Sequence, residues 1–150
     1  MTSEQPSFQK AKKYCAYQER SQQEVRDKLY EWGLHRNEVE QIITQLISEN
    51  YLNEQRFAVA YAGGKFRING WGRLKIKQGL EAKRVSRPCI TEALNKLDKR
   101  DYEAALKKLI SEKTKTIKEN NPFRKKHQVA RYIISKGYEP ELVWEILKEM

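Results

Sequence analysis

The feature that most limits the fold of this chain is an internal repeat. When 51 or 104 is added to the numbers of residues 21–46, the apolar positions of that segment fall on apolar residues again, without a gap inside any copy. So many coincidences indicate three copies of one unit of about 50 residues. The matching positions are Val25 with Ile76 and Val129, Leu29 with Leu80 and Ile133, Leu34 with Val85 and Tyr138, Val39 with Ile90 and Val143, Ile42 with Ala93 and Ile146, Ile43 with Leu94 and Leu147, and Leu46 with Leu97 and Met150.

Helix start and stop signals recur in the first and third copies. Ser21 and Glu24 have the spacing of a capping box, in which the serine oxygen accepts a backbone N–H and the glutamate reaches back. Gly33 then ends this helix, because glycine readily adopts positive φ. In the third copy an Asn-Pro pair at 121–122 opens a helix that Gly137 ends. Both copies are therefore predicted to be helix-turn-helix units.

The middle copy contains the run LKIK at 74–77, whose strict alternation is by itself typical of a half-buried β-strand. Because the equivalent segments of the other copies are helical, we predict a helix here, with Ile76 and Leu80 facing inward and the basic side chains facing mostly outward. Arg84 stands where the other copies have glycine, so the end of this helix is left open.

An upstream helix is expected in each copy, at about 7–18, 54–67 and 101–118, the last with an apolar stripe at i, i+3, i+4 and i+7. The predicted fold class is all-α, with three tandem three-helix repeats at 1–50, 51–98 and 99–150. Because a module this small buries few side chains, its neighbours must supply apolar surface. We therefore expect an elongated, curved molecule.

Composition favours a cytoplasmic protein that does not span a membrane. No run of about 18 apolar residues is present, and the first segment, MTSEQPSFQKAKKY, lacks the apolar core of a secretory signal. Cys15 and Cys89 are an isolated pair without CxxC spacing, which indicates two reduced thiols.

The net charge of +10 is unevenly distributed. Residues 19–54 carry 4 Lys and Arg against 8 Asp and Glu, whereas residues 55–100 carry 12 against 3. The flanking segments, 1–18 and 101–150, have net charges of +2 and +3. An acidic segment followed by a strongly basic one is suited to a polyanion, to an acidic protein surface, or to both.

Two basic clusters are the candidate binding site, one in the middle copy and one on the equivalent helix of the third copy. Contacts to phosphate there would be non-specific and sensitive to salt, with dissociation constants of roughly 10⁻⁴–10⁻⁶ M. The candidate filament-binding or DNA-binding residues are Lys65, Arg67, Arg73, Lys75, Lys77, Lys83, Arg84, Arg124, Lys125, Lys126 and Arg131. Stacking on bases is conceivable for Trp71, Phe66, Tyr61 and Tyr17, but core packing is the simpler role for most of them, and Trp71 in its glycine-rich turn is the exception.

The sequence contains little that indicates a catalytic site. His35 and His127 lie in different copies without ligands at metal-binding spacing, and His127 is interpreted as one more polar residue of a basic helix. Gly63-Gly64 and the Gly70-Trp71-Gly72 segment lack the frame of a phosphate-binding loop and are interpreted as turns between helices. We therefore expect neither an enzyme, nor a cofactor, nor a metal site.

Two groups of short motifs stand in the first and second copies. The first group is Tyr14-Cys15-Ala16-Tyr17, Arg20-Ser21, Glu24-Val25, Lys28-Leu29 and Gly33. The second is Asn50-Tyr51-Leu52-Asn53-Glu54, Arg56-Phe57-Ala58, Tyr61, Gly70-Trp71-Gly72-Arg73-Leu74 and Leu80. In order and spacing, both resemble the RecX family of bacterial recombination regulators. Lys83-Arg84-Val85 departs from the Lys-Gly-Ile that is usual in that family.

The resemblance implies a non-catalytic protein that binds the RecA recombinase, mainly as its filament on single-stranded DNA, and we expect this protein to be a monomer. It implies inhibition of ATP hydrolysis, strand exchange and co-protease activity, and thereby modulation of DNA repair, recombination and the SOS response. Two alternatives stay open: a general nucleic-acid-binding module that competes for DNA, and a helical scaffold for an unrelated acidic partner.

Overall fold

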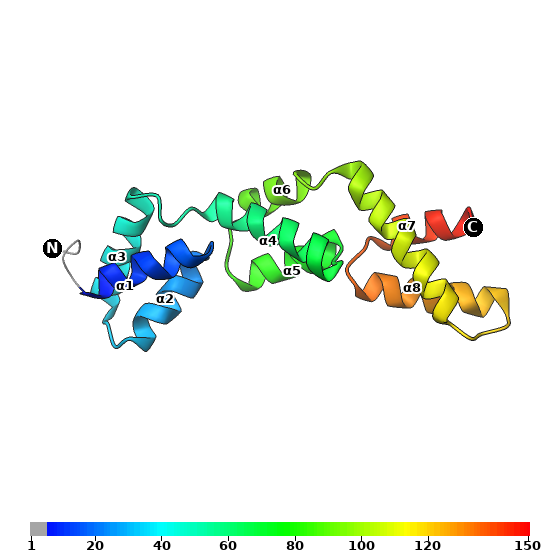
Figure 1. Cartoon of the computed structure of the whole chain (residues 1–150), viewed down its shortest axis with the longest axis horizontal. Coiled ribbons are helices and arrows are strands. Elements are labelled where there is room, and N and C mark those ends of the chain that lie inside the picture. Colours follow the sequence, from blue (N-terminus) through cyan, green and yellow to red (C-terminus); the bar gives the residue numbers. More distant parts are fainter. Residues whose placement is uncertain (1–5) are drawn as a thin grey trace. The chain divides into compact units, whose positions relative to one another are not determined.

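The computed structural model describes residues 6–150, and within that range the chain consists of helices and short connections (Figure 1). This confirms the predicted all-α fold class. The helices of the described range are α1 (Pro6–Tyr17), α2 (Gln22–Glu31), α3 (Arg36–Ser48), α4 (Glu54–Asn69), α5 (Arg73–Ala82), α6 (Arg87–Asn95), α7 (Lys99–Thr116), α8 (Pro122–Ser135) and α9 (Pro140–Lys148). Residues 1–5, which begin the segment searched for a secretory signal, lie outside this range.

The alternating run at 74–77 lies inside helix α5, so the helix prediction is confirmed and the strand alternative is wrong. Ile76 and Leu80 are fully buried, as expected for the inward face. Lys77 is exposed, and Lys75 is half-buried. Apolar and basic residues of α5 therefore alternate along the sequence, while their burial follows the helical period.

Helices α2 and α8 begin at the predicted capping residues. The Ser21 hydroxyl oxygen accepts a hydrogen bond from the Glu24 N–H at 3.0 Å, and the Ser21 N–H donates to the Glu24 carboxylate at 2.8 Å. At the start of α8, the Asn121 side-chain oxygen accepts from the Arg124 N–H at 3.1 Å. Both starts thus satisfy backbone donors that lack a partner within their helix.

The second residue after the second helix has a left-handed backbone in all three copies. Its φ is +91° at Gly33, +101° at Gly137 and +60° at Arg84. Left-handed conformation costs a residue with a side chain about 1–2 kcal/mol, so Arg84 adopts it at a cost that the two glycines avoid. The end of α5, which the sequence left open, is therefore set by the same turn as in the other copies.

One sequence interpretation is wrong: Gly63-Gly64 is part of helix α4 and is not a turn. Each glycine costs a helix about 1 kcal/mol relative to alanine. The inward side of α4 offsets this cost, because Phe57, Ala58 and Ala62 are all buried.

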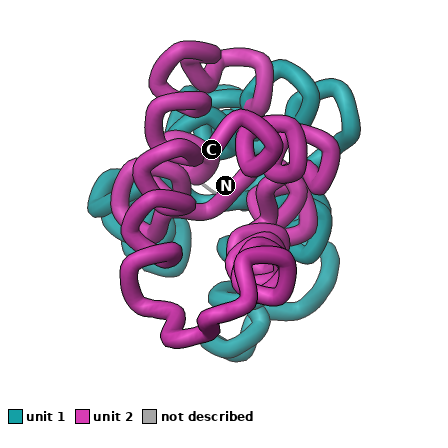
Figure 2. The backbone as a smooth tube through the Cα atoms, turned by 90° about the vertical axis from the view of Figure 1, so that its right-hand side faces the viewer, with its two compact units in different colours: residues 1–60, 80–93 teal, residues 61–79, 94–150 magenta. Residues whose placement is uncertain are grey.

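The chain divides into two compact units, coloured separately in Figure 2. Unit 1 comprises residues 1–60 and 80–93, and unit 2 comprises residues 61–79 and 94–150. Each unit thus combines one end repeat with part of the middle repeat. The predicted repeat boundaries and the elongated shape stay predictions.

Each unit has an apolar core built largely from the repeated positions. The core of unit 1 includes Phe8, Ala11, Cys15, Val25, Leu29, Val39, Ile42, Ile43, Leu46 and Leu52. The core of unit 2 includes Tyr102, Leu106, Ile110, Val129, Ala130, Ile133, Tyr138, Val143, Ile146 and Leu147. The last repeated position departs from the pattern, because Leu46 is buried whereas Met150 is 57% exposed.

Within unit 2, the start of α5 meets the end of α8 through two glycines. The Gly72 N–H donates to the Lys136 carbonyl at 2.8 Å, and the Leu74 N–H donates to the Gly137 carbonyl at 2.9 Å. A Cβ atom on Gly72 would lie 2.4 Å from the carbonyl carbon of Gly137, so only glycine permits this approach. N–H groups at the start of α5 thus find acceptors in the turn just beyond the end of α8.

A polar group from three elements surrounds this junction. The Tyr102 hydroxyl accepts from the Arg73 N–H at 2.9 Å and donates to the Glu139 carboxylate at 2.6 Å. The Arg73 guanidinium binds the other Glu139 oxygen at 2.8 Å and lies 3.7 Å from the centroid of the Tyr102 ring. These contacts hold α5, α7 and the start of α9 together.

Candidate nucleic-acid interface

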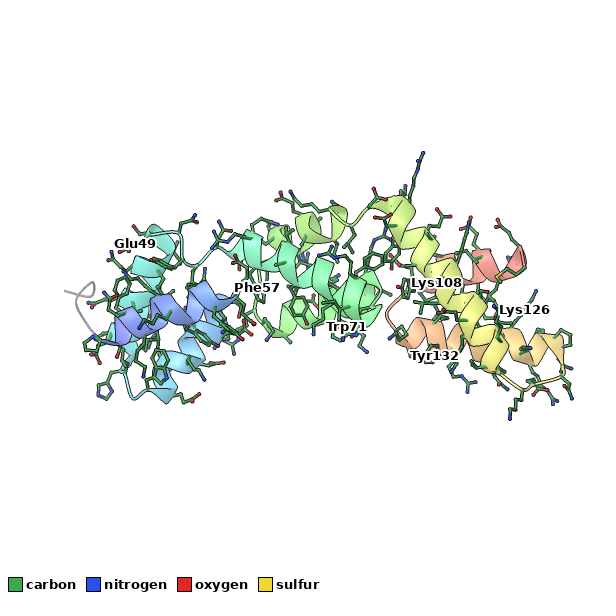
Figure 3. All side chains as sticks on the ribbon, in the orientation of Figure 1. Glu49, Phe57, Trp71, Lys108, Lys126 and Tyr132 are labelled. Atoms are coloured by element: carbon green, nitrogen blue, oxygen red, sulfur yellow. The ribbon has the colours of Figure 1, made fainter. Side chains whose placement is uncertain are left out.

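The most concentrated part of the candidate site is a tryptophan with two lysines over its ring. Trp71 is half-buried in the turn between α4 and α5 (Figure 3). The Nζ atoms of Lys65 and Lys75 lie 4.9 and 4.8 Å from its ring centroid. Each such contact contributes about 0.5–1 kcal/mol at an exposed site, so the ring helps to position both ammonium groups. We call these three residues the Trp71 cluster.

Arg67 and Lys77 are exposed basic residues that stand two positions along the chain from Lys65 and Lys75. The Arg67 guanidinium lies against Gly63, where a Cβ atom would come within 2.8 Å of it. Neither Arg67 nor Lys77 forms a salt bridge within residues 6–150. Both charges are therefore available to an external anion.

Two of the predicted contacts are already used inside their own units. Arg73 is held by Glu139 and Tyr102, as described above. In unit 1, the Lys83 ammonium binds Glu24, the capping-box carboxylate, at 3.0 Å. Arg84 is exposed in the following turn. Arg73 and Lys83 thus have structural partners, and we leave them out of the proposed interface.

Helix α8 carries the second basic cluster. Arg124 and Arg131 are exposed, whereas Lys125 and Lys126 are half-buried. These two lysines help to line a small apolar cavity of about 170 Å³ together with Val129. The arginines and the lysines of α8 thus point to different surroundings.

A row of three aromatic rings in contact beside this cluster was not predicted from the sequence. The His127 ring lies 4.4 Å from Phe123 and 4.8 Å from Trp144, measured between centroids. Phe123 is 71% exposed. The spacing of Phe123 and His127, four residues apart on one helix, was a signal that the two rings could meet. The contact with Trp144 of α9 depends on tertiary packing.

The other aromatic candidates have different surroundings. Phe66 packs against the core residue Tyr102, with 5.7 Å between the ring centroids. Tyr61 is half-buried, with the Lys65 ammonium 5.5 Å from its ring centroid. Tyr17, at the end of α1, is 82% exposed.

Burial shifts the pKa of several side chains. Burial alone would raise the pKa of Glu139, but the hydrogen bonds from Tyr102 and Arg73 outweigh it and hold the pKa below its usual value. Burial raises the pKa of Tyr138 to about 12 and that of the Cys15 thiol to about 11. Cys15 is therefore protonated at neutral pH and is part of the core rather than a reactive thiol.

The described residues were searched for metal-ligand clusters, cavities and membrane-spanning helices. Within residues 6–150, no three His, Cys, Asp or Glu side chains gather closely enough to hold a metal ion. A cavity of about 250 Å³ between α7 and α9 is lined by both signs of charge, including Arg73, Lys99 and Glu145. None of the helices in this range is long and apolar enough to cross a membrane.

Comparison with known proteins points to one family. Residues 8–46 match the first three-helix domain of RecX, and residues 53–94 match its second three-helix domain. Among curated relatives, "Regulatory protein RecX" of Clostridium tetani is 30% identical over 142 residues, covering 93% of this chain and 63% of that protein. The RecX of Bacillus mycoides is 25% identical and is matched over 97% of this chain and 54% of its own length.

Solved structures agree with the fold. The crystal structure of RecX from Lactobacillus salivarius superposes with a TM-score of 0.86 at 22% identity, covering 95% of this chain and 93% of that one. A second crystal structure of a regulatory protein RecX also has a TM-score of 0.86 and covers 96% of this chain. The chain spans about 54–63% of the length of the curated relatives cited above. On its two matched domains and its fold, this chain belongs to the RecX family.

Proposed function

We propose that this chain is a non-catalytic regulator that binds the RecA filament on single-stranded DNA. It inhibits the filament's ATP hydrolysis, strand exchange and co-protease activity, and so moderates recombination, DNA repair and the SOS response. Membership in a family whose curated members are named regulatory proteins supports this proposal.

The observation that carries the proposal is the Trp71 cluster with its exposed neighbours. Lys65 and Lys75 converge on one ring, and Lys77 and Arg67 add exposed charge close by in sequence. A surface with this density of cations attracts a polyanion or an acidic protein face. A filament of recombinase on DNA offers both.

The test measures the ATPase of a cognate recombinase filament titrated with the full chain. The variant Lys75→Glu/Lys77→Glu should lose inhibition at least about tenfold in potency, because each change reverses a charge at the contact. It keeps Arg73, whose pair with Glu139 supports the fold. The matched control is Lys96→Glu/Lys108→Glu, which makes the same charge change at exposed positions of unit 2. A folded Lys75→Glu/Lys77→Glu variant that inhibits like the wild type would refute the assignment.

A second candidate function is that of a nucleic-acid-binding module that competes with the recombinase for DNA. The same cationic side chains support this candidate. Repeating the titration at two DNA concentrations separates the two. Competition requires that excess single-stranded DNA relieve inhibition, whereas filament binding gives inhibition at protein amounts far below DNA saturation.

A further inference from the structure

The exposed face of α8 combines aromatic and cationic side chains. Phe123, His127 and Arg131 follow one another at four-residue spacing, and Arg124 lies next to them on the same side of the helix. All four are exposed. We call these four residues the α8 stripe.

Helix α8 contains no acidic residue. Neither Arg124 nor Arg131 takes part in any salt bridge of the described chain. A solvated helix face normally mixes both signs of charge. The stripe is therefore a cationic surface without internal compensation.

The aromatic part of the stripe is held in place while remaining open. The ring of Phe123 contacts the ring of His127 at 4.4 Å between centroids, and His127 in turn meets the ring of Trp144 edge-on at 4.8 Å. The His127 Nδ1 lies 3.3 Å from the Phe123 carbonyl oxygen, which also links the two residues. Yet Phe123 remains 71% exposed, so most of its ring faces solvent.

An exposed ring followed along the helix by two arginines matches the chemistry of single-stranded nucleic acid. Such surfaces bind by stacking bases on aromatic side chains and by pairing phosphates with cations. Phe123 and Arg131 are eight residues apart, or about 12 Å along the helix. That length accommodates about three to four bases at roughly 3.4 Å each. Duplex DNA keeps its bases stacked inside, so it can use the arginines but not the ring.

We infer that the α8 stripe binds single-stranded DNA directly, with a base stacked on Phe123 and phosphates on Arg124 and Arg131. This inference rests on the proposed function and refines it, because it assigns the stripe to the DNA strand rather than to the recombinase. The Trp71 cluster is then free to contact either component of the filament.

The test compares the affinity of the full chain for a fluorescent thymidine oligomer and for a duplex of the same length, by anisotropy. Phe123→Ala should weaken single-strand binding at least about fivefold and leave duplex binding within about twofold. Phe123→Trp should restore single-strand binding, because it supplies another ring. The control is Tyr30→Ala, which removes a 43% exposed ring from unit 1 and should have no effect.

Substitution of Arg124 and Arg131 provides a second test. Arg124→Ala and Arg131→Ala should each weaken both DNA forms and lower the slope of log affinity against log salt by about 1. Arg100→Ala, an exposed arginine of the same unit, should leave that slope unchanged.

The inference is overturned if Phe123→Ala affects neither form or both forms equally, or if Tyr30→Ala has the same effect. The ATPase assay of the recombinase filament distinguishes failure of this inference from failure of the proposed function. If the wild type inhibits the recombinase but Phe123→Ala does not weaken DNA binding, only the role of the α8 stripe is refuted. If Phe123→Ala weakens single-strand binding but the wild type does not inhibit the recombinase, only the regulatory function is refuted.

Discussion

Single residues of this chain have roles that depend on what packs against them. The two glycines of the α5–α8 junction show this most directly, because the backbones of Gly72 and Gly137 touch. Gly64, by contrast, lies in α4 with open space where its Cβ would be. The same residue type is thus indispensable at one position and replaceable at another.

Gly72→Ala should destabilise the protein by about 1–3 kcal/mol, because the new methyl group has to displace the backbone of Gly137. Gly64→Ala is the matched control and should stabilise by about 0.5–1 kcal/mol, since it removes a glycine from a helix interior without a clash. Urea unfolding of both variants measures the difference. Equal stabilities would contradict the close approach at Gly72.

At the scale of elements, unit 2 is joined by a polar group rather than by apolar packing alone. Arg73 of α5 and Tyr102 of α7 both bind Glu139, which precedes α9. Because this carboxylate receives hydrogen bonds from both partners, its pKa in the folded state is lowered. The stability of the junction between α5, α7 and α9 therefore depends on pH.

The sign of this linkage follows from the lowered pKa. A carboxyl whose pKa is lower when folded contributes stability that is present above its unfolded pKa, about 4.5, and lost as pH falls through the folded value. Glu139→Gln should cost about 1–3 kcal/mol at pH 7, and its difference from the wild type should shrink in acid. Glu112→Gln, an exposed carboxylate of the same unit, is the control. A difference that is constant from pH 7 to pH 3 would contradict a charged Glu139 at the junction.

At the scale of the whole molecule, the uneven charge is the dominant property. A net charge of +10 with 12 Lys and Arg among residues 55–100 favours association with polyanions through long-range attraction. Acidic residues concentrate instead at 19–54, where several are used in ion pairs, such as Glu24 with Lys83 and Glu40 with Arg26.

This distribution predicts a strong salt dependence for the intact chain. Four phosphate contacts, at the two lysines of the Trp71 cluster and the two arginines of the α8 stripe, would lower single-strand affinity roughly fiftyfold between about 50 and 200 mM salt. Anisotropy at several salt concentrations measures the slope. A flat profile would show that phosphates contribute little to binding.

The sequence by itself determined the helices and their order. Capping residues, helix-ending glycines and the apolar period act within about one turn of the chain, so they can be identified without tertiary structure. The local pattern of the LKIK run left helix and strand open. The position of this run within the repeat predicted a helix, and the structure confirms it.

Only the tertiary structure decided which candidate cations are available and which rings meet. Arg73 and Lys83 look like their neighbours in sequence, yet their carboxylate partners are 66 and 59 residues away. His127 of α8 and Trp144 of α9 meet only because the two helices pack together. Such contacts depend on how helices dock, and local propensity and charge counting carry no information about docking.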